Sequence, residues 1–215
     1  MSKLQGLRKA SHFGPTLIVT TIGWLFANYY WWEGPAYVIA FGIFCGQLVV
    51  GWSNDLYDYE DDLAHQRTKK PLVAGLITPE YLRKWIYFMT PFAFIANLFG
   101  PLGIKGGFVY MLGIACGIGY NFYFKFNAAS PLPFAIAFAA LPSSIAISKE
   151  ITPPVWMWLG GALWGMAAHF INVIKDMDQD QASGINGLPQ RLGKKRSVVA
   201  AGALIALGAI TLYLF

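Results

Sequence analysis

The stretch that decides the fold is residues 35–62, PAYVIAFGIFCGQLVVGWSNDLYDYEDD. Residues 35–53 contain no charged side chain. This run has about the length of a membrane-crossing helix, which takes about 20 largely apolar residues. The sequence becomes strongly acidic directly after this run: residues 54–62 hold five of its 11 acidic residues. The stretch therefore predicts a membrane helix that ends in a cluster of carboxylates.

The composition of the whole chain extends this prediction. Hydrophobic residues make up 56% of the 215 residues and charged residues only 13%, about half the usual charged share of roughly 25%. A soluble protein so poor in charge could not cover its surface, whereas a lipid-facing protein has no such need. Cys45 and Cys116 both lie in apolar stretches, and we expect them to be small buried side chains.

Further apolar runs of spanning length occur along the chain, separated by loops rich in proline and glycine. They predict an all-α fold, a polytopic membrane bundle of about seven transmembrane helices within a single domain, 1–215. The seven predicted spans are roughly 14–32, 35–53, 84–100, 106–124, 131–148, 154–174 and 197–215.

The basic residues indicate how the bundle is oriented. The loops on the cytoplasmic side of membrane proteins carry an excess of Lys and Arg. With a cytoplasmic N-terminus, 14 of the 16 basic residues lie on the cytoplasmic side, and only Lys105 and Lys149 lie outside. The net charge of +5 is therefore a signal of topology, and it excludes nucleic acid as a partner. The protein is expected in the membrane with its acidic clusters on the cytoplasmic side.

The acidic residues follow a helical pattern. Asn54, Asp58 and Asp62 are four residues apart in turn, so they lie along one face of a helix. Asp176 and Asp180 repeat this spacing in a second cluster, residues 176–180, which holds three more carboxylates. The corresponding order of a span, acidic residues and a basic loop in both halves suggests a pseudo-repeat with two facing metal sites.

The second stripe extends into the predicted span. His169, Asn172 and Asp176 are spaced i, i+3 and i+7, and polar residues inside a span are costly unless they serve a site. Two plainer interpretations remain open: the acidic clusters are solvated loops, or His169 is a buried histidine bonded to a neighbouring helix.

The acidic stripes predict a bound cation, because like charges at i, i+4 repel each other. Carboxylate and amide oxygens without cysteine favour a hard ion, Mg²⁺ before Ca²⁺. Mg²⁺ characteristically takes few protein carboxylates together with waters and substrate phosphates. The metal ligands predicted on the two stripes are Asn54, Asp58, Asp62, Asp176 and Asp180.

Basic side chains follow both stripes. Arg67 and Lys70 come after the first stripe, Arg191 comes after the second, and Lys125 closes the fourth predicted span. Taken singly, each of them can also be interpreted as a determinant of membrane topology. Beside Mg²⁺-binding carboxylates, however, Arg and Lys can form a clamp for a diphosphate. The pattern therefore predicts an intramembrane enzyme that acts on a lipid diphosphate.

With these motifs the chain resembles the UbiA superfamily of intramembrane prenyltransferases. Its first motif, NDxxDxxxD, is matched by Asn54, Asp55, Asp58 and Asp62, and the Arg-Thr…Pro-Leu…Gly element by Arg67, Thr68, Pro71, Leu72 and Gly75. The Tyr…Lys element is matched by Tyr120, Tyr123 and Lys125, and the second motif by Asp176, Asp180 and the run GINGLPQRLG at 184–193.

The resemblance covers roughly residues 5–215 and has two departures. The second motif often carries a further aspartate seven residues before its DxxxD, and His169 stands at that position here. The family usually has nine helices, whereas seven are predicted, and the sequence stops at Leu214-Phe215 while it is still apolar. The expectation is either a short member or a sequence without the last two helices.

The resemblance implies Mg²⁺-dependent transfer of a prenyl group from an isoprenoid diphosphate to a lipophilic or aromatic acceptor in membrane lipid. Asp58, Asp176 and His169 would then be catalytic, and Asp55 would join the metal ligands of the first stripe. The predicted substrate-binding residues are Arg67, Lys70, Lys125, Arg191, Tyr57, Tyr120, Tyr123 and Asn172, with the aromatic rings facing an allylic cation. Terpene cyclisation is a related alternative, and a cation transporter or a non-catalytic fragment are alternatives of another class.

Overall fold

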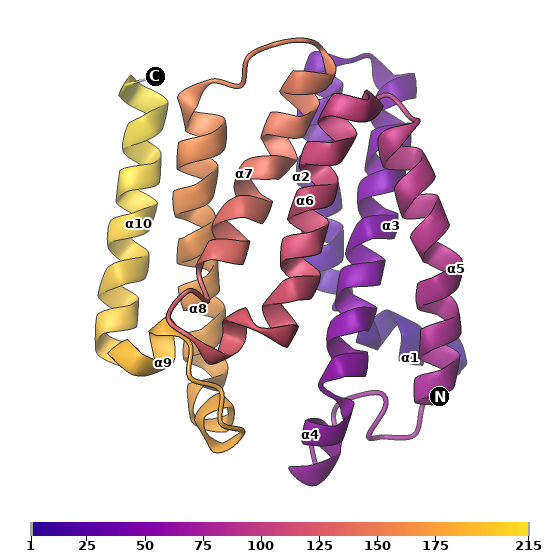
Figure 1. Cartoon of the computed structure of the whole chain (residues 1–215), viewed down its shortest axis with the longest axis vertical. Coiled ribbons are helices and arrows are strands. Elements are labelled where there is room, and N and C mark those ends of the chain that lie inside the picture. The colour runs from indigo at the N-terminus through magenta and orange to yellow at the C-terminus, as the bar shows by residue number, and fades with distance from the viewer. Residues whose placement is uncertain (1, 215) are drawn as a thin grey trace. The chain divides into compact units, whose positions relative to one another are not determined.

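The computed structural model describes residues 2–214, and within this range it contains helices and no strand (Figure 1). Met1 and Phe215, the two ends of the predicted domain, lie outside the described residues. The chain divides into two compact units, residues 1–107 and 108–215. The boundary falls inside α6 (Gly103–Phe122).

The first unit is organised around one long helix, α3. Both α2 and α5 pack on it. The first helix of the chain, α1, joins a core that includes Leu7, Leu48, Trp52 and Leu82. Thr78 caps the N-terminus of α5: its side-chain oxygen accepts a hydrogen bond from the Tyr81 N–H at 3.2 Å. The helices are α1 (Lys3–Ala10), α2 (Phe13–Tyr30), α3 (Glu33–Tyr57), α4 (Tyr59–Ala64) and α5 (Pro79–Leu98).

The second unit is organised around α8, which packs against both α7 and α10 (Figure 1). Gly161 and Gly165 let α8 approach α7 closely, because a Cβ at Gly161 would lie 2.9 Å from the Phe138 carbonyl oxygen and one at Gly165 would collide with the Phe134 backbone. After α6 come η1 (Phe124–Phe126), α7 (Leu132–Ser148), the π-helical turn η2 (Trp156–Gly160), α8 (Gly161–Ala182), α9 (Leu188–Leu192) and α10 (Lys194–Leu214).

The long helices coincide with the predicted spans. Seven helices of at least 17 residues occupy the seven predicted segments in the described part of the chain. Four of the described helices are long and apolar enough to cross a membrane: α3, α6, α10 and the continuous helix Trp156–Ala182. The equally apolar α7 has 17 residues. The all-α fold is confirmed, and the count of seven spans stays a prediction.

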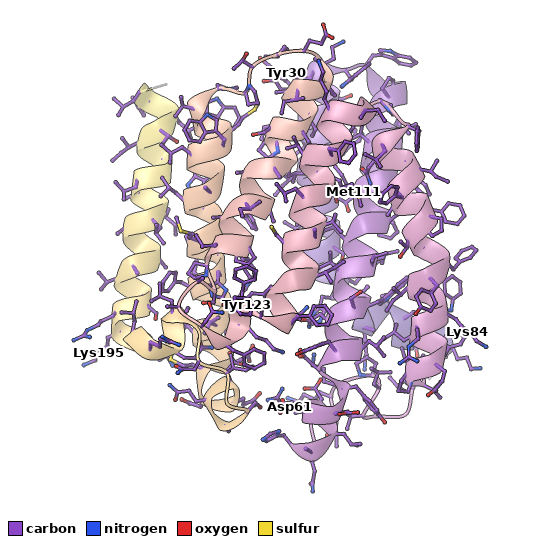
Figure 2. The ribbon with its side chains drawn as sticks, in the orientation of Figure 1. Tyr30, Asp61, Lys84, Met111, Tyr123 and Lys195 are labelled. Carbon is purple, nitrogen blue, oxygen red and sulfur yellow. The ribbon has the colours of Figure 1, made fainter. Side chains whose placement is uncertain are left out.

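The predicted topology can be tested within the first unit. Figure 2 places Asp61 at the end of this unit opposite to Tyr30, and Lys105 is exposed at the start of α6. In a protein with Cys45 and Cys116 replaced by alanine, we expect a membrane-impermeant maleimide to label Asp61→Cys only from the cytoplasmic side. Lys105→Cys should be labelled only from the other side. Labelling of both variants from the same side would contradict the topology.

Candidate functional site

The first acidic cluster lies where α3 gives way to α4. The sequence predicts one continuous helical stripe through Asn54, Asp58 and Asp62, but α3 ends at Tyr57 and α4 begins at Tyr59. The interruption at Asp58 is slight. The Asp58 N–H donates to the Asn54 carbonyl at 3.0 Å, and the Asp58 carbonyl accepts from the Asp62 N–H at 2.8 Å. The i, i+4 order of the stripe is therefore kept across the junction.

Two carboxylates of this cluster are buried, and basic side chains lie between them. Asp55 and Asp62 are each 2% exposed. Lys70 Nζ lies 2.7 Å from Asp55 Oδ1 and 3.7 Å from Asp62 Oδ2. Arg67 Nη1 donates to Asp62 Oδ1 at 2.7 Å and lies 3.4 Å from Asp61. The acidic and basic motifs of the first half are therefore joined in one ion-pair cluster.

Burial and charge oppose each other in this cluster. Burial raises the pKa of Asp62, although Lys70 and Arg67 act to lower it. Burial also disfavours the charged form of Lys70, but Asp55 and Asp62 outweigh this effect and raise the pKa of Lys70. Lys70 therefore stays protonated. Part of the charge compensation that the sequence pattern assigns to a metal ion comes from these basic side chains.

The residues of the cluster fit a magnesium ion. Asp55 Oδ2 is buried and has no hydrogen-bond partner, so one carboxylate oxygen is available as a ligand. Within residues 2–214 no group of three or more His, Cys, Asp or Glu side chains converges on a common point. Mg²⁺ is often held by one or two carboxylates plus waters and substrate phosphates, and Asp55 has one such oxygen without a partner.

A tight turn carries the basic residues back to the carboxylates. The Arg67 N–H donates to the Asp62 carbonyl at 2.9 Å, and the Lys70 N–H donates to the Arg67 carbonyl at 2.9 Å. Gly75 closes the segment with a φ of +66°, a left-handed conformation that glycine adopts without strain. Tyr57, a predicted substrate contact, is exposed at the end of α3.

The second acidic cluster occupies the last turns of α8. Asp176 and Asp178 are exposed, and Asp180 is half-buried. Asp180 Oδ2 accepts a hydrogen bond from Gln190 Nε2 at 2.9 Å. This bond ties the second stripe to α9, and hence to the run 184–193 that follows it.

The predicted binding residues of the second unit differ in exposure. Lys125 is buried in η1, with Nζ 5.3 Å from the centre of the Phe126 ring. Arg191 is exposed on α9, and its Nε donates to the Asn186 carbonyl at 2.9 Å. Asn172 and Tyr123 are exposed and Tyr120 is half-buried.

His169 is buried among aromatic rings. It is 1% exposed, and its ring centre lies 4.7 Å from that of Phe134 and 5.5 Å from that of Tyr120. Its Nε2 lies 3.0 Å from Ser130 Oγ, which also accepts from the Leu188 N–H at 2.9 Å. Its Nδ1 has no hydrogen-bond partner. One ring nitrogen is thus satisfied and the other is not.

The sequence pattern did not point to three residues that contact the predicted ones: His12, Ser130 and Gln190. His12 Nε2 lies 3.3 Å from Asp55 Oδ1. Its position just before a predicted span, on the same side as the acidic stripes, was the signal that could have found it. Gln190 lies within the run 184–193 that follows the second stripe, and this was its signal. Ser130 carries no such signal, since its partner His169 is 39 residues away along the chain.

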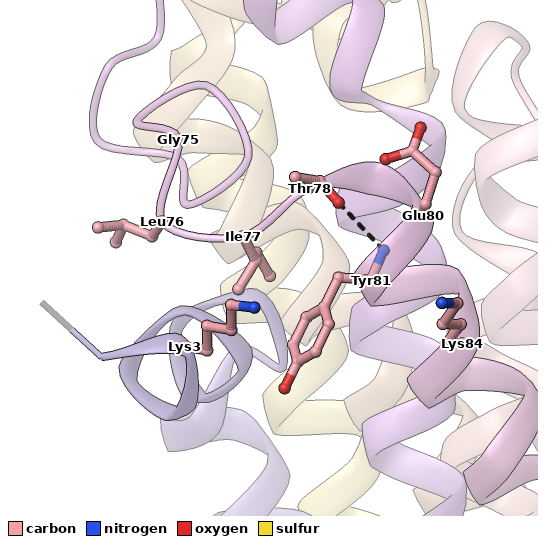
Figure 3. Close-up of a pocket in the computed structure, with 8 residues that line it drawn as sticks. All are labelled: Lys3, Gly75, Leu76, Ile77, Thr78, Glu80, Tyr81 and Lys84. Atoms are coloured by element: carbon pink, nitrogen blue, oxygen red, sulfur yellow. Dashed lines mark hydrogen bonds between the residues drawn. The ribbon is translucent and has the colours of Figure 1, made fainter.

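A cavity of about 290 Å³ lies elsewhere in the first unit (Figure 3). Its lining includes Lys3, Thr78, Tyr81 and Lys84, and Lys3 Nζ lies 5.0 Å from the centre of the Tyr81 ring. None of the predicted site residues lines this cavity. It belongs to the junction of α1 with the start of α5.

The whole pattern of helices and motifs matches one family. The sequence model of the UbiA prenyltransferase family matches residues 16–215. The chain belongs to this family. It is accordingly an integral membrane protein, as its apolar helices indicate.

Two curated relatives within the family are known enzymes. Digeranylgeranylglyceryl phosphate synthase of Hyperthermus butylicus is 26% identical over 167 residues, covering 72% of this chain and 54% of the relative. The 4-hydroxybenzoate octaprenyltransferase of Saccharophagus degradans is 28% identical over 153 residues, covering 69% of this chain and 50% of the relative. The matched part is thus about half the length of these relatives.

Solved structures of UbiA homologues share the fold. A homologue from Archaeoglobus fulgidus, bound to DMAPP and Mg²⁺, has a TM-score of 0.80 at 14% identity and covers 95% of this chain and 75% of its own. The apo structure of a homologue from Aeropyrum pernix K1 has a TM-score of 0.73 at 18% identity and covers 98% and 78%.

Proposed function

We propose that this protein transfers a prenyl group from an isoprenoid diphosphate to a lipophilic or aromatic acceptor within the membrane, and that it requires Mg²⁺. The observation that carries the proposal is the buried cluster at the end of α3. There, two carboxylates alternate with Lys70 and Arg67, and Asp55 keeps one oxygen without a partner. Family membership and the DMAPP and Mg²⁺ bound to a homologue support it.

Both acidic stripes would supply ligands for Mg²⁺. Asn54, Asp55, Asp58 and Asp62 belong to the first unit, and Asp176 and Asp180 to the second. Mg²⁺ held by these residues would neutralise phosphate oxygens and so assist the departure of diphosphate.

The basic side chains beside the carboxylates would also contact the diphosphate. In the structure Lys70 and Arg67 pair with carboxylates. Lys70 would keep its contact with Asp55 and offer its remaining N–H groups to phosphate oxygens, and Arg67 is suited to bidentate contact with them. Lys125 and Arg191 are proposed as further contacts of the diphosphate.

The reaction itself needs little covalent chemistry from the protein. The allylic C–O bond breaks with its electron pair remaining on diphosphate, and the acceptor nucleophile then bonds to the allylic carbon and releases a proton. Aromatic faces such as those of Tyr57, Tyr120 and Tyr123 would stabilise the cation. Apolar helices would exclude the water that would otherwise capture it.

The proposal is tested by incubating the purified protein with radiolabelled geranyl, farnesyl and geranylgeranyl diphosphates. Each is supplied with phenolic or glycerol-phosphate acceptors, with Mg²⁺ or with excess chelator. We expect pyrophosphate release and a labelled lipid adduct only when both acceptor and Mg²⁺ are present. A labelled hydrocarbon formed without acceptor would indicate cyclisation instead. No pyrophosphate release with any of these substrates would refute the proposal.

His169 is expected to serve the acceptor or the cation and not the metal. Mg²⁺ favours oxygen ligands over imidazole, and the ring lies among Tyr120 and Phe134. His169→Ala should therefore bind diphosphate normally and form product about a hundredfold more slowly, at the lower end of the roughly 10²–10⁴-fold that a lost proton-transfer group costs.

The matched variant for this test is Ser130→Ala, which keeps the imidazole and removes its hydrogen-bond partner. It should fall between the wild-type protein and His169→Ala in product yield. If His169→Ala retains full binding and full yield, the histidine is only structural. If binding is lost and His169→Asp restores it, His169 belongs to the metal site.

A further inference from the structure

The elbow between α1 and α2, residues Ser11 and His12, has an unusual backbone. His12 adopts the left-handed conformation, with φ 49° and ψ 54°, which is uncommon and strained for a residue other than glycine. It stands at the N-cap of α2, yet its side chain makes no capping hydrogen bond. Local helix capping therefore does not explain why a histidine occupies this position.

The elbow is fixed against α3. Gly51 lies so close that a Cβ there would come within 2.6 Å of the Ser11 carbonyl oxygen. The next residue of α3 is Trp52, whose Nε1 donates to the Leu7 carbonyl at 2.9 Å, and Ser11 and Trp52 are both buried. The Thr16 hydroxyl donates to the Ser11 carbonyl at 2.8 Å. The backbone of the elbow is thus held from two sides, next to the turn of α3 that carries Asp55.

This placement brings the imidazole to one oxygen of Asp55. His12 Nε2 lies 3.3 Å from Asp55 Oδ1, the same oxygen that receives Lys70 Nζ at 2.7 Å. The other oxygen, Oδ2, is buried and has no partner. Two neighbours therefore occupy one side of the carboxylate and leave the other side available.

We infer that His12 is a positioning residue that, with Lys70, holds Asp55 Oδ1 so that Oδ2 is presented to a divalent cation. The inference rests on the proposed function. Partners of this kind orient metal ligands, and their loss typically lowers metal affinity by about 10–100-fold. The strained backbone of the elbow is then explained by the contact that it creates.

The test measures metal binding directly and does not depend on turnover. Mn²⁺ replaces Mg²⁺ as a spectroscopic probe, with inorganic pyrophosphate present. Bound Mn²⁺ is counted by the loss of the free-ion signal in electron paramagnetic resonance, relative to a protein-free sample with the same Mn²⁺ and pyrophosphate, because pyrophosphate itself complexes the ion. The variants are His12→Ala, His12→Gly and His12→Gln, with Asp55→Asn as the reference for a lost ligand. His12→Gly relieves the backbone strain while it removes the ring, so it separates folding from metal binding.

The matched control is His65→Ala. His65 Nδ1 lies 3.2 Å from Asp61 Oδ1, but that pair is partly exposed and stands apart from Asp55. We expect His12→Ala and His12→Gly to weaken Mn²⁺ binding about tenfold or more, His12→Gln to recover part of it through its amide N–H, and His65→Ala to bind as the wild-type protein does.

Each other result has a defined meaning. If His12→Gly binds Mn²⁺ as tightly as the wild-type protein while Asp55→Asn has lost it, the inference is wrong and the proposed function stands. If the wild-type protein does not bind Mn²⁺, the proposed metal site is refuted, and the inference about His12 is refuted with it. If all three His12 variants fail to fold while Asp55→Asn folds, His12 is a folding residue and the inference is overturned.

Discussion

Asp58→Asn and Asp176→Asn should each lower prenyl transfer by about a thousandfold or more, because a lost metal ligand removes several kcal/mol of charge stabilisation and each 1.36 kcal/mol is tenfold in rate. Neither residue belongs to the buried pair formed by Asp55 and Asp62. Asp58 is half-buried at the junction of α3 and α4, and Asp176 is exposed at the end of α8. Both variants should therefore fold, and the measurement is pyrophosphate release in detergent.

Each cluster supplies its own control. Asp61→Asn and Asp178→Asn remove a neighbouring carboxylate that lies outside the proposed ligand set, and both should keep activity within a few-fold of the wild-type protein. Asp61 contacts Arg67 at 3.4 Å, so a small change in the apparent KM for diphosphate is expected there. Full activity in Asp58→Asn or Asp176→Asn would refute the use of both stripes.

Lys70→Met should lower stability in chelator and make the protein depend on Mg²⁺ for its stability. The substitution leaves Asp55 and Asp62, each 2% exposed, without the cation that joins them. Removing one partner of a buried ion pair costs about 3–5 kcal/mol and of an exposed pair about 1 kcal/mol or less. Lys70 is 28% exposed, so we expect a loss of about 2 kcal/mol, between these limits.

The measurement is the apparent Tm in detergent, in EDTA and in Mg²⁺. Mg²⁺ should raise the Tm of Lys70→Met more than that of the wild-type protein, because the ion replaces the missing charge. Lys69→Met is the matched control, since Lys69 is exposed next to Lys70 and no ion pair joins it to the cluster in the described residues. An unchanged Tm for Lys70→Met in EDTA would show that the buried pair does not need Lys70.

The helices could be predicted from the sequence because length and hydrophobicity determine them. Residues 35–53 have no charge, and they lie within α3. The site could be predicted less completely. Ideal helical spacing selected Asn54, Asp58 and Asp62, and Asp55 entered only through the family motif. The structure shows Asp55 and Asp62 as the buried pair, because the turn that follows α4 brings Lys70 between them.

Contacts between distant segments could not be predicted from the sequence, because they depend on packing and on backbone conformation rather than on helical spacing. The contact of His12 with Asp55 depends on an elbow in a left-handed conformation, which no periodicity reveals. The hydrogen bond of His169 with Ser130 joins residues 39 positions apart. Helical spacing places His169 on a polar stripe with Asn172 and Asp176, but only packing decides that His169 is buried while the other two are exposed.

The ion-pair cluster at the end of α3 has a consequence for how the protein is made. Asp55, Asp62, Lys70 and Arg67 together carry two negative and two positive charges. Burying a compensated set of ions costs less than burying unpaired ones. The nascent chain can therefore be inserted by the translocon and reach its packed state before any divalent ion arrives. Under the proposed function, insertion and metal binding are then separate events, and protein produced under Mg²⁺ starvation should be correctly inserted and become active when the ion is added.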